Sequence, residues 1–195
     1  MPKVSDIATL RNGFAFRGRI ESAKECDTRV IQASDLVKDA ELDLNKLSCV
    51  RLGKQVPRYH VGENDIVFMA RGQRQLAYRP IQRPVTGKPV ITTFGLLIIT
   101  ADKQHTSAAY LHWALNTPQV QQRLQAMKEG TSISFLSEKN LGSVEIPLPS
   151  HKEQQKIVRL ITLHTKRERV RQELAKMDLK ITQTTAWSLA TEQHK

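Results

Sequence analysis

The stretch EIPLPSHKEQQKIVRLI, residues 145–161, changes character halfway along. Prolines at 147 and 149 end a short apolar run and disfavour any helix that would start earlier. Ser150 and Glu153 then form a capping box, in which the hydroxyl accepts from a free backbone N–H and the carboxylate reaches back to the cap. The stretch therefore predicts a domain over residues 1–149 followed by a long helix in residues 150–195.

This helix carries an apolar stripe that it cannot bury alone. No Gly or Pro occurs between Ser150 and residue 189, which allows about 40 helical residues, or roughly 60 Å at 1.5 Å per residue. Apolar residues recur three and four positions apart, as in a coiled coil, with Arg167 in one slot. These seam residues are Leu160, Leu163, Val170, Leu174, Met177 and Ile181. We expect the seam to pair with a second helix, parallel or antiparallel. The alternative is a helix folded back onto its own domain, which so long a helix would overhang.

Composition sets broader limits. The chain has 195 residues, of which 39% are hydrophobic, and no run approaches the ~20 apolar residues of a membrane span. The N-terminus lacks the apolar segment of a secretory signal, so we expect a cytoplasmic protein. Cys26 and Cys49, its two cysteines, provide neither a disulfide framework nor a zinc cluster. We expect both to be reduced, half-buried thiols.

The positive charge is concentrated in two places. The chain carries a net charge of +11, whereas residues 1–50 balance eight basic against eight acidic side chains. Residues 51–90 carry eight basic side chains and two acidic ones, which gives +6, and residues 151–195 carry ten and five, which gives +5. Basic charge gathered in this way suits a polyanion such as nucleic acid.

The remaining elements indicate an α+β fold, a mixed-sheet domain with short helices followed by one long coiled-coil-type helix. Strands are expected near residues 29–32, 65–69 and 90–100, and again just before Pro147. Residues 71–90 contain Gly and Pro without periodicity, which is typical of an extended, exposed loop or ribbon. Ser107 is expected to cap one helix, and Thr117 with Pro118 to begin another that ends near Gly130.

Motifs of catalysis are missing from the sequence. Gly87-Lys88 is not part of a phosphate-binding loop, and Asn116-Thr117-Pro118 is better explained as a helix cap than as a methyltransferase motif. Asp178 and Lys180 lie two positions apart on a helix, so they do not share a face. The six histidines show no ligand spacing. We expect a non-catalytic protein without cofactor or metal, and keep a small nuclease or DNA-modifying enzyme, or an RNA-binding or scaffolding protein, as alternatives.

Two segments have the composition of a DNA-contacting surface. Arginine pairs with guanine and glutamine with adenine through two hydrogen bonds each, and both residue types gather in ARGQRQLAYR (70–79). In GTSISF (130–135), small hydroxyl residues suit contacts to phosphates. The candidate residues for DNA are Arg71, Gln73, Arg74, Gln75, Tyr78, Arg79, Lys88, Thr131, Ser132 and Ser134.

Several phrases together resemble the specificity (S) subunit of Type I restriction-modification systems. They are RNGFAFRG (11–18), VIQASDL (30–36), GENDIVFMARG (62–72), AYLHWALNTPQVQQRL (109–124) and GTSISFLSEKNLGSVEIPLPSHKEQQKIV (130–158). The most specific is the Leu-Pro-x-x-x-x-Gln run that leads into the long helix.

The resemblance implies a target recognition domain followed by a spacer helix. It also implies that the protein binds double-stranded DNA and that methyltransferase subunits and, through them, a restriction subunit dock on it. Family members commonly hold two such units, each of which reads one half of a bipartite site. This chain holds one unit, which implies either a half-subunit that forms a homodimer through its helix or a truncated half. The recognised DNA sequence does not follow from the residues.

Overall fold

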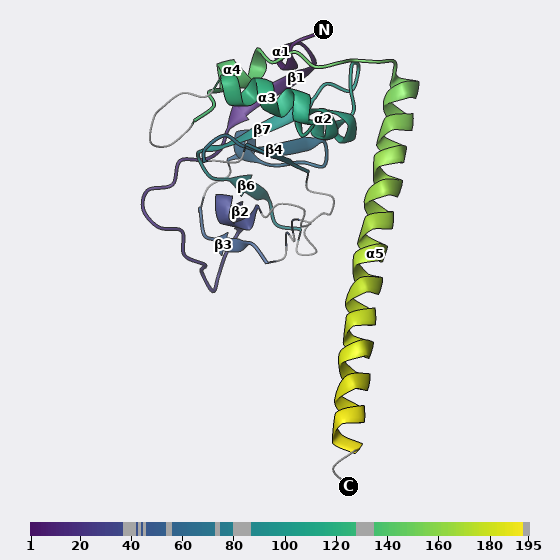
Figure 1. Cartoon of the computed structure of the whole chain (residues 1–195). Coiled ribbons are helices and arrows are strands. Elements are labelled where there is room, and N and C mark those ends of the chain that lie inside the picture. Colours follow the sequence, from purple (N-terminus) through teal and green to yellow (C-terminus); the bar gives the residue numbers. More distant parts are fainter. Residues whose placement is uncertain are drawn as a thin grey trace. The chain divides into compact units, whose positions relative to one another are not determined.

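The computed structural model describes residues 1–36, 42, 44, 46–53, 56–72, 75–79, 87–127 and 135–192 (Figure 1). The chain divides into two compact units, Met1–Gln154 and Gln155–Lys195. The first turn of the last helix therefore belongs to the globular unit, and the division lies slightly beyond the predicted boundary at residue 149.

A four-stranded antiparallel sheet forms the centre of the globular unit. Its order is β1 (Ala8–Asn12), β7 (Leu96–Ala101), β4 (Asp65–Met69) and β5 (Ala77–Tyr78). Strands β4 and β7 are buried along nearly their whole length, as expected of central strands rich in apolar residues. The prediction of a strand at 65–69 is confirmed.

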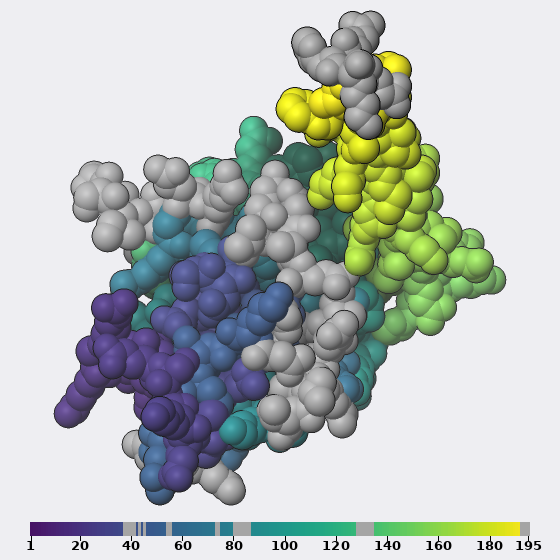
Figure 2. Space-filling view, turned by 90° about the horizontal axis from the view of Figure 1, so that it is seen from below, coloured from purple at the N-terminus to yellow at the C-terminus, as the bar shows by residue number. Residues whose placement is uncertain are grey.

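A three-stranded sheet packs against the first one. Its order is β3 (Ser48–Val50), β2 (Thr28–Ile31) and β6 (Val90–Thr92), with β2 antiparallel to β3 and parallel to β6. Successive side chains of a strand face opposite sides, so Val30 and Ile31 enter two different hydrophobic clusters. Ile31 packs with Val67 and Leu96 of the larger sheet, so part of the core lies between the two sheets. Figure 2 shows the outer surface on the side of the smaller sheet, in purple and blue.

Short helices cover the other side of the larger sheet (Figure 1). Helix α2 (Ala108–Leu115) begins as predicted, because the Ser107 hydroxyl accepts from the backbone N–H of Tyr110 at 3.2 Å. Helix α3 (Pro118–Ala126) starts at the predicted proline and ends before Gly130, which lies outside the described residues. The unit also contains α1 (Val4–Ile7), α4 (Glu138–Gly142) and 3-10 turns at Ala33–Asp35 and Pro57–Tyr59.

Two predicted strands were wrong. The apolar run 90–100 is not one strand but two, β6 and β7, which belong to different sheets. A turn at Phe94 and Gly95 separates them, with Gly95 at a φ of +97°, a conformation that favours glycine. The predicted last strand before Pro147 is only a single bridge between Lys3 and Glu145, and the helix α4 precedes it.

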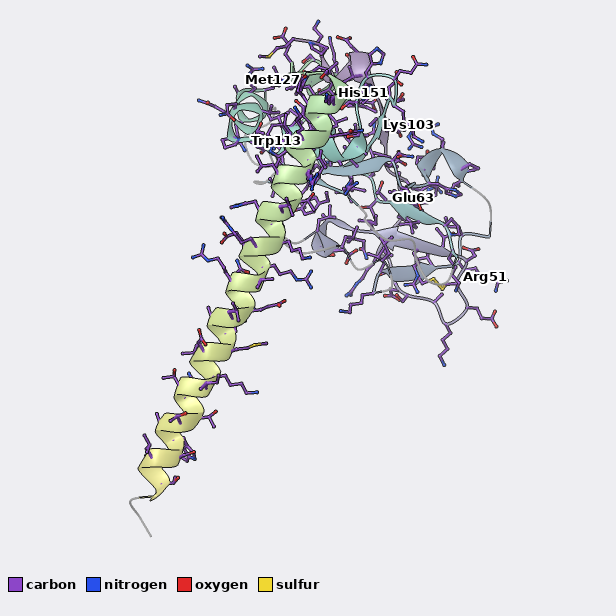
Figure 3. All side chains as sticks on the ribbon, turned by 90° about the vertical axis from the view of Figure 1, so that its right-hand side faces the viewer. Arg51, Glu63, Lys103, Trp113, Met127 and His151 are labelled. Carbon is purple, nitrogen blue, oxygen red and sulfur yellow. A yellow bond between two sulfur atoms is a disulfide. The ribbon has the colours of Figure 1, made fainter. Side chains whose placement is uncertain are left out.

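The two cysteines form a disulfide, so the prediction of reduced thiols was wrong. Cys26 and Cys49 have their Cα atoms 5.5 Å apart, within the range that a disulfide bridges. The bond appears in yellow near Arg51 in Figure 3. The bond joins the long N-terminal connection to β3. The fold brings the two cysteines together, although they lie 23 positions apart in the sequence.

The long helix α5 (His151–Glu192) has the predicted length and start. Its capping box is present, because the Ser150 N–H donates to the Glu153 carboxylate at 3.1 Å and the Glu153 N–H donates to the Ser150 hydroxyl at 3.4 Å. At 1.5 Å per residue, its 42 residues extend about 63 Å.

Gln154, the glutamine of the Leu-Pro-x-x-x-x-Gln run, anchors the first turn of α5. Its side chain is buried, and its carbonyl accepts from the Thr106 hydroxyl at 3.1 Å while its amide donates to the carbonyls of His105 and Pro149 at 3.0 Å each. His151, labelled in Figure 3, donates to the Gln104 carbonyl at 3.0 Å.

Candidate nucleic-acid interface

The two segments predicted to contact DNA meet where the structure describes their ends. Arg71 forms an isolated antiparallel bridge with Phe135, and the Leu136 N–H donates to the Ala70 carbonyl at 2.9 Å. The sequence separates these positions by more than sixty residues. Arg71, just after the end of β4 in the first segment, therefore lies beside Phe135, the last residue of the second segment.

Arg71 lies close to two aromatic rings at this junction. Its guanidinium carbon is 5.0 Å from the ring centre of Phe94 and 5.5 Å from that of Phe135, which is cation–π distance. Gly95 allows this placement, since a Cβ there would lie 3.1 Å from the Arg71 Cδ. We call Arg71, Phe94 and Phe135 the Arg71 cluster.

The guanidinium of Arg71 remains available for a ligand. The Arg71 side chain is exposed, and no hydrogen bond or ion pair joins it to another described residue. Arg11, by contrast, donates to the Asp65 carboxylate at 3.0 Å and to the Arg58 carbonyl at 2.9 Å. Contacts with the two rings restrict the Arg71 side chain without neutralising its charge, so less conformational entropy is lost when it binds.

Contacts from the helices fix the far end of the first segment. The Asn116 side chain exchanges two hydrogen bonds with the backbone of Ala77, accepting from its N–H at 3.0 Å and donating to its carbonyl at 2.9 Å. Gln121 donates to the Gln75 carbonyl at 2.9 Å. Residues 77–78 form the short strand β5 on the edge of the sheet. This part of the predicted extended, exposed loop or ribbon is therefore extended, but it is not fully exposed, because Gln75 and Ala77 are buried.

The predicted DNA-contacting residues have different surroundings. Gln75 is fully buried, so we do not carry it forward as a base contact. Tyr78 is half-buried, and its hydroxyl donates to the Leu36 carbonyl at 3.3 Å. Arg79 is also half-buried. Burial, together with the nearby charge of Arg79, holds the pKa of His112 below its usual value.

Lys88 is engaged with the disulfide. Its ammonium lies 3.2 Å from the Cys26 sulfur and 4.0 Å from the Cys49 sulfur. The side chain is half-buried, and sulfur is only a weak acceptor. A phosphate would therefore compete with a modest interaction, and Lys88 stays a predicted contact to the DNA backbone.

Five predicted contacts lie outside the described residues: Gln73, Arg74, Thr131, Ser132 and Ser134. They stay predictions. Sequence reasoning missed Phe94 and Phe135, which complete the Arg71 cluster. The signal for Phe94 was the glycine after it, because Phe94-Gly95 interrupts an apolar run with a turn dipeptide.

The described residues also include candidate sites of other kinds. Among these residues, no group of three or more His, Cys, Asp or Glu side chains is placed to hold a metal ion. A hollow of about 730 Å³ beside the disulfide is lined in part by Asp27, Arg51 and His60. The Asp27 carboxylate accepts from the N–H groups of Leu52 and Gly53, which lowers its pKa. Within the described part of the chain, no helix is long and apolar enough to cross a membrane.

The sequence comparison identifies the family. The model of a family described as "Type I restriction modification DNA specificity domain" matches residues 1–176. The chain belongs to this family. The resemblance found in the sequence is thereby confirmed, and with it the assignment to a DNA-specificity module. No curated protein sequence gave a significant match.

Solved structures share the fold of the DNA specificity family. The S subunit of a Type I system from M. genitalium is 15% identical with a TM-score of 0.57, and the alignment covers 85% of this chain and 38% of that one. The HsdS subunit from Thermoanaerobacter tengcongensis is 14% identical with a TM-score of 0.59, and the alignment covers 86% of this chain and 37% of that one.

A third similar chain comes from a structural study of complex assembly and conformational transition in the type I R-M system. It is 15% identical with a TM-score of 0.60, over 92% of this chain and 42% of that chain. The present chain thus spans about two fifths of the length of these three chains.

Proposed function

We propose that the protein reads one half of a bipartite DNA site and directs the methyltransferase and restriction subunits of a Type I restriction-modification complex to it. The family match carries this proposal. The Arg71 cluster supports it, because an exposed arginine at cation–π distance from two rings lies where both predicted DNA segments meet. The DNA target and the partner subunits place this activity in the cytoplasm.

The proposed reading unit is the globular unit, and α5 is the proposed spacer. The matched S subunits are more than twice as long as this chain, as expected if each holds two domain-plus-helix units. We infer that a second unit is supplied by a second copy. A symmetric dimer would recognise a palindromic bipartite site, with a gap set by the helix length.

The seam of α5 supports the pairing. Its six apolar residues are between 46% and 69% exposed in the isolated chain. Burying a side chain such as leucine contributes about 1.5–3 kcal/mol, so six from each copy provide a substantial driving force. The next two positions of the repeat are Thr184 and Ser188, which ends the apolar seam at Ile181.

Selection of duplexes from a random pool tests the proposal. The 195-residue chain, alone and with the methyltransferase subunits, should enrich a sequence with two identical half-sites in inverted orientation. The same preparation incubated with DNA and Mg²⁺, or with a methyl donor, should show no turnover without those subunits. Failure to enrich any duplex in the presence of the subunits, or turnover by the chain alone, would contradict the proposal.

A further inference from the structure

Phe94 is an unusual surface residue. It is 50% exposed, and among the described residues of the globular unit only Met1, at the chain terminus, is another exposed large hydrophobic. A single exposed apolar residue is ordinary in itself. The position of Phe94, on a firmly held turn beside an available arginine, requires an explanation.

The turn that carries Phe94 is held from several sides. The Leu96 N–H donates to the Thr93 carbonyl at 3.1 Å and closes the turn, while the Phe94 N–H donates to the Phe14 carbonyl at 2.9 Å. Gly13 packs so closely that a Cβ there would lie 2.2 Å from the Thr93 carbonyl oxygen. The backbone beneath the Phe94 ring is therefore fixed by the segment that begins RNGFAF.

The ring and the neighbouring guanidinium form a composite surface. Arg71 supplies a positive charge that no described acidic residue neutralises, and Phe94 supplies an apolar face next to it. Proteins that bend DNA insert apolar side chains such as Phe between base steps, and basic residues beside them contact the groove. A fixed backbone suits such a wedge, since the ring must resist the base pairs that it separates.

We propose that Phe94 is a DNA wedge, which inserts its ring at a base step of the bound duplex while Arg71 contacts the groove beside it. The inference rests on the proposed function, because it concerns the same DNA complex. Pyrimidine–purine steps unstack most easily, so such a step is expected at the insertion point. Phe94 would then select the DNA sequence through the deformability of the base step and not through hydrogen bonds to the bases.

The test compares Phe94→Ala, Phe94→Leu and Arg71→Ala on the selected duplex. Base–aromatic stacking is worth about 1–3 kcal/mol per base, so Phe94→Ala should weaken binding roughly 5- to 150-fold. Phe94→Leu, which keeps an apolar wedge, should weaken it less. Phe94→Ala should leave the salt dependence unchanged, whereas Arg71→Ala should reduce the slope by about one phosphate equivalent if its contact is to a phosphate. Lys103→Ala, a surface change in the loop after β7, is the control for general effects.

A fluorescent readout separates insertion from mere support of Arg71. With 2-aminopurine placed at successive positions, wild-type protein should raise the fluorescence at one step, and Phe94→Ala should abolish this rise. Thermal unfolding of each variant checks that the fold is intact.

Wild-type affinity of Phe94→Ala for the selected duplex would overturn the wedge. If wild-type protein raised the 2-aminopurine fluorescence at no position, the wedge would be overturned as well. This holds even if the binding losses of Phe94→Ala and Arg71→Ala are not additive. In each case wild-type protein still selects its duplex, so the proposed function stands. Failure of the wild type to select any duplex is the separate result that removes the proposed function.

Discussion

In the globular unit, side chains such as Phe68, Ile98 and Leu111 are fully buried between sheets and helices, whereas in α5 no described residue after Gln154 is buried. Both regions contain regular secondary structure. Their difference lies in where the apolar side chains find partners, since the globular unit provides its own and α5 does not. Helices in proteins are stabilised mainly by tertiary packing of one apolar face. The globular unit therefore buries its own apolar side chains, whereas α5 leaves its apolar seam exposed, as the proposed pairing requires.

The polar contacts of the two units differ in the same way. In the globular unit, the buried Asp65 carboxylate accepts from Arg11 at 3.0 Å and from the Gly62 N–H at 2.8 Å. On α5, Glu168 pairs with Arg167 at 3.1 Å and with Arg171 at 3.3 Å, in exposed ion pairs along one helix. Exposed ion pairs contribute little to stability. These ion pairs on α5 are therefore not expected to decide the proposed pairing, which would depend on the seam.

The largest effect is expected from Leu174→Asp in the seam. A symmetric dimer would bury two carboxylates without partners, which should weaken association by about 4 kcal/mol or more, or about 1000-fold. Sedimentation should give a dimer for the wild type and a monomer for the variant. Gln172→Asp adds the same charge at an exposed position outside the seam and should leave the dimer intact. If the wild type were a monomer at all concentrations, or if Leu174→Asp still formed the dimer, the proposal that the seam of α5 pairs with a second copy would be refuted.

The next effect is expected within the globular unit, from Gly13→Ala. The added Cβ would lie 2.2 Å from the Thr93 carbonyl oxygen, and this backbone cannot move without displacing the β6–β7 turn. The unfolding free energy should fall by about 3 kcal/mol, the upper range for an overpacked site. In Gly62→Ala, the added Cβ would meet Asp65 at an ordinary 3.6 Å. Urea unfolding that gave equal losses for both variants would refute the close-approach explanation.

Local signals in the sequence predicted the features that depend on neighbouring residues. Prolines 147 and 149 with Ser150 and Glu153 located the start of α5, and Ser107 located the start of α2, because caps involve residues three positions apart. The seam was likewise a matter of spacing. Such features require no knowledge of the rest of the fold.

Features that depend on distant residues were missed or predicted wrongly. Gln75 looked like a base contact, but its backbone is bonded by Gln121, 46 positions away, and its side chain is buried. The disulfide joins residues that only the β2–β3 pairing brings close. Phe94 gained its place through Gly13 and Arg71, which approach it from two other segments. Tertiary contacts decide which polar residues remain at the surface.

A smaller effect is expected where the two units join. Gln154→Leu would leave the carbonyls of His105 and Pro149 and the buried Thr106 hydroxyl without their present partner. Unpaired buried groups should cost about 2 kcal/mol of unfolding free energy. In a Trp187→Phe background, the fluorescence of Trp113 reports on the globular unit alone. Gln155→Leu, at the exposed neighbouring position, is the matched control and should change the stability little, and a result in the reverse order would contradict the anchoring role.

The smallest effect is a pH dependence confined to the globular unit. Burial first, and then the charge of Arg79, lower the pKa of His112 in the folded protein, where the His112 Nε2 lies 3.3 Å from the Asn116 amide that binds Ala77. The unfolded chain therefore binds a proton that the folded protein excludes, and stability should decline as the pH falls below the ordinary histidine pKa of about 6.5.

Urea midpoints at pH 7.5 and 5.5 measure this decline, and His112→Gln should reduce it. Asp27 and Asp102 have pKa values lowered from 3.8, so they do not titrate in this range. His164→Gln changes an exposed histidine on α5 and should leave the decline as it is. If His164→Gln removed the pH dependence and His112→Gln did not, the proton that lowers stability would bind to α5. The pH dependence would then not belong to the globular unit, and the prediction would be wrong.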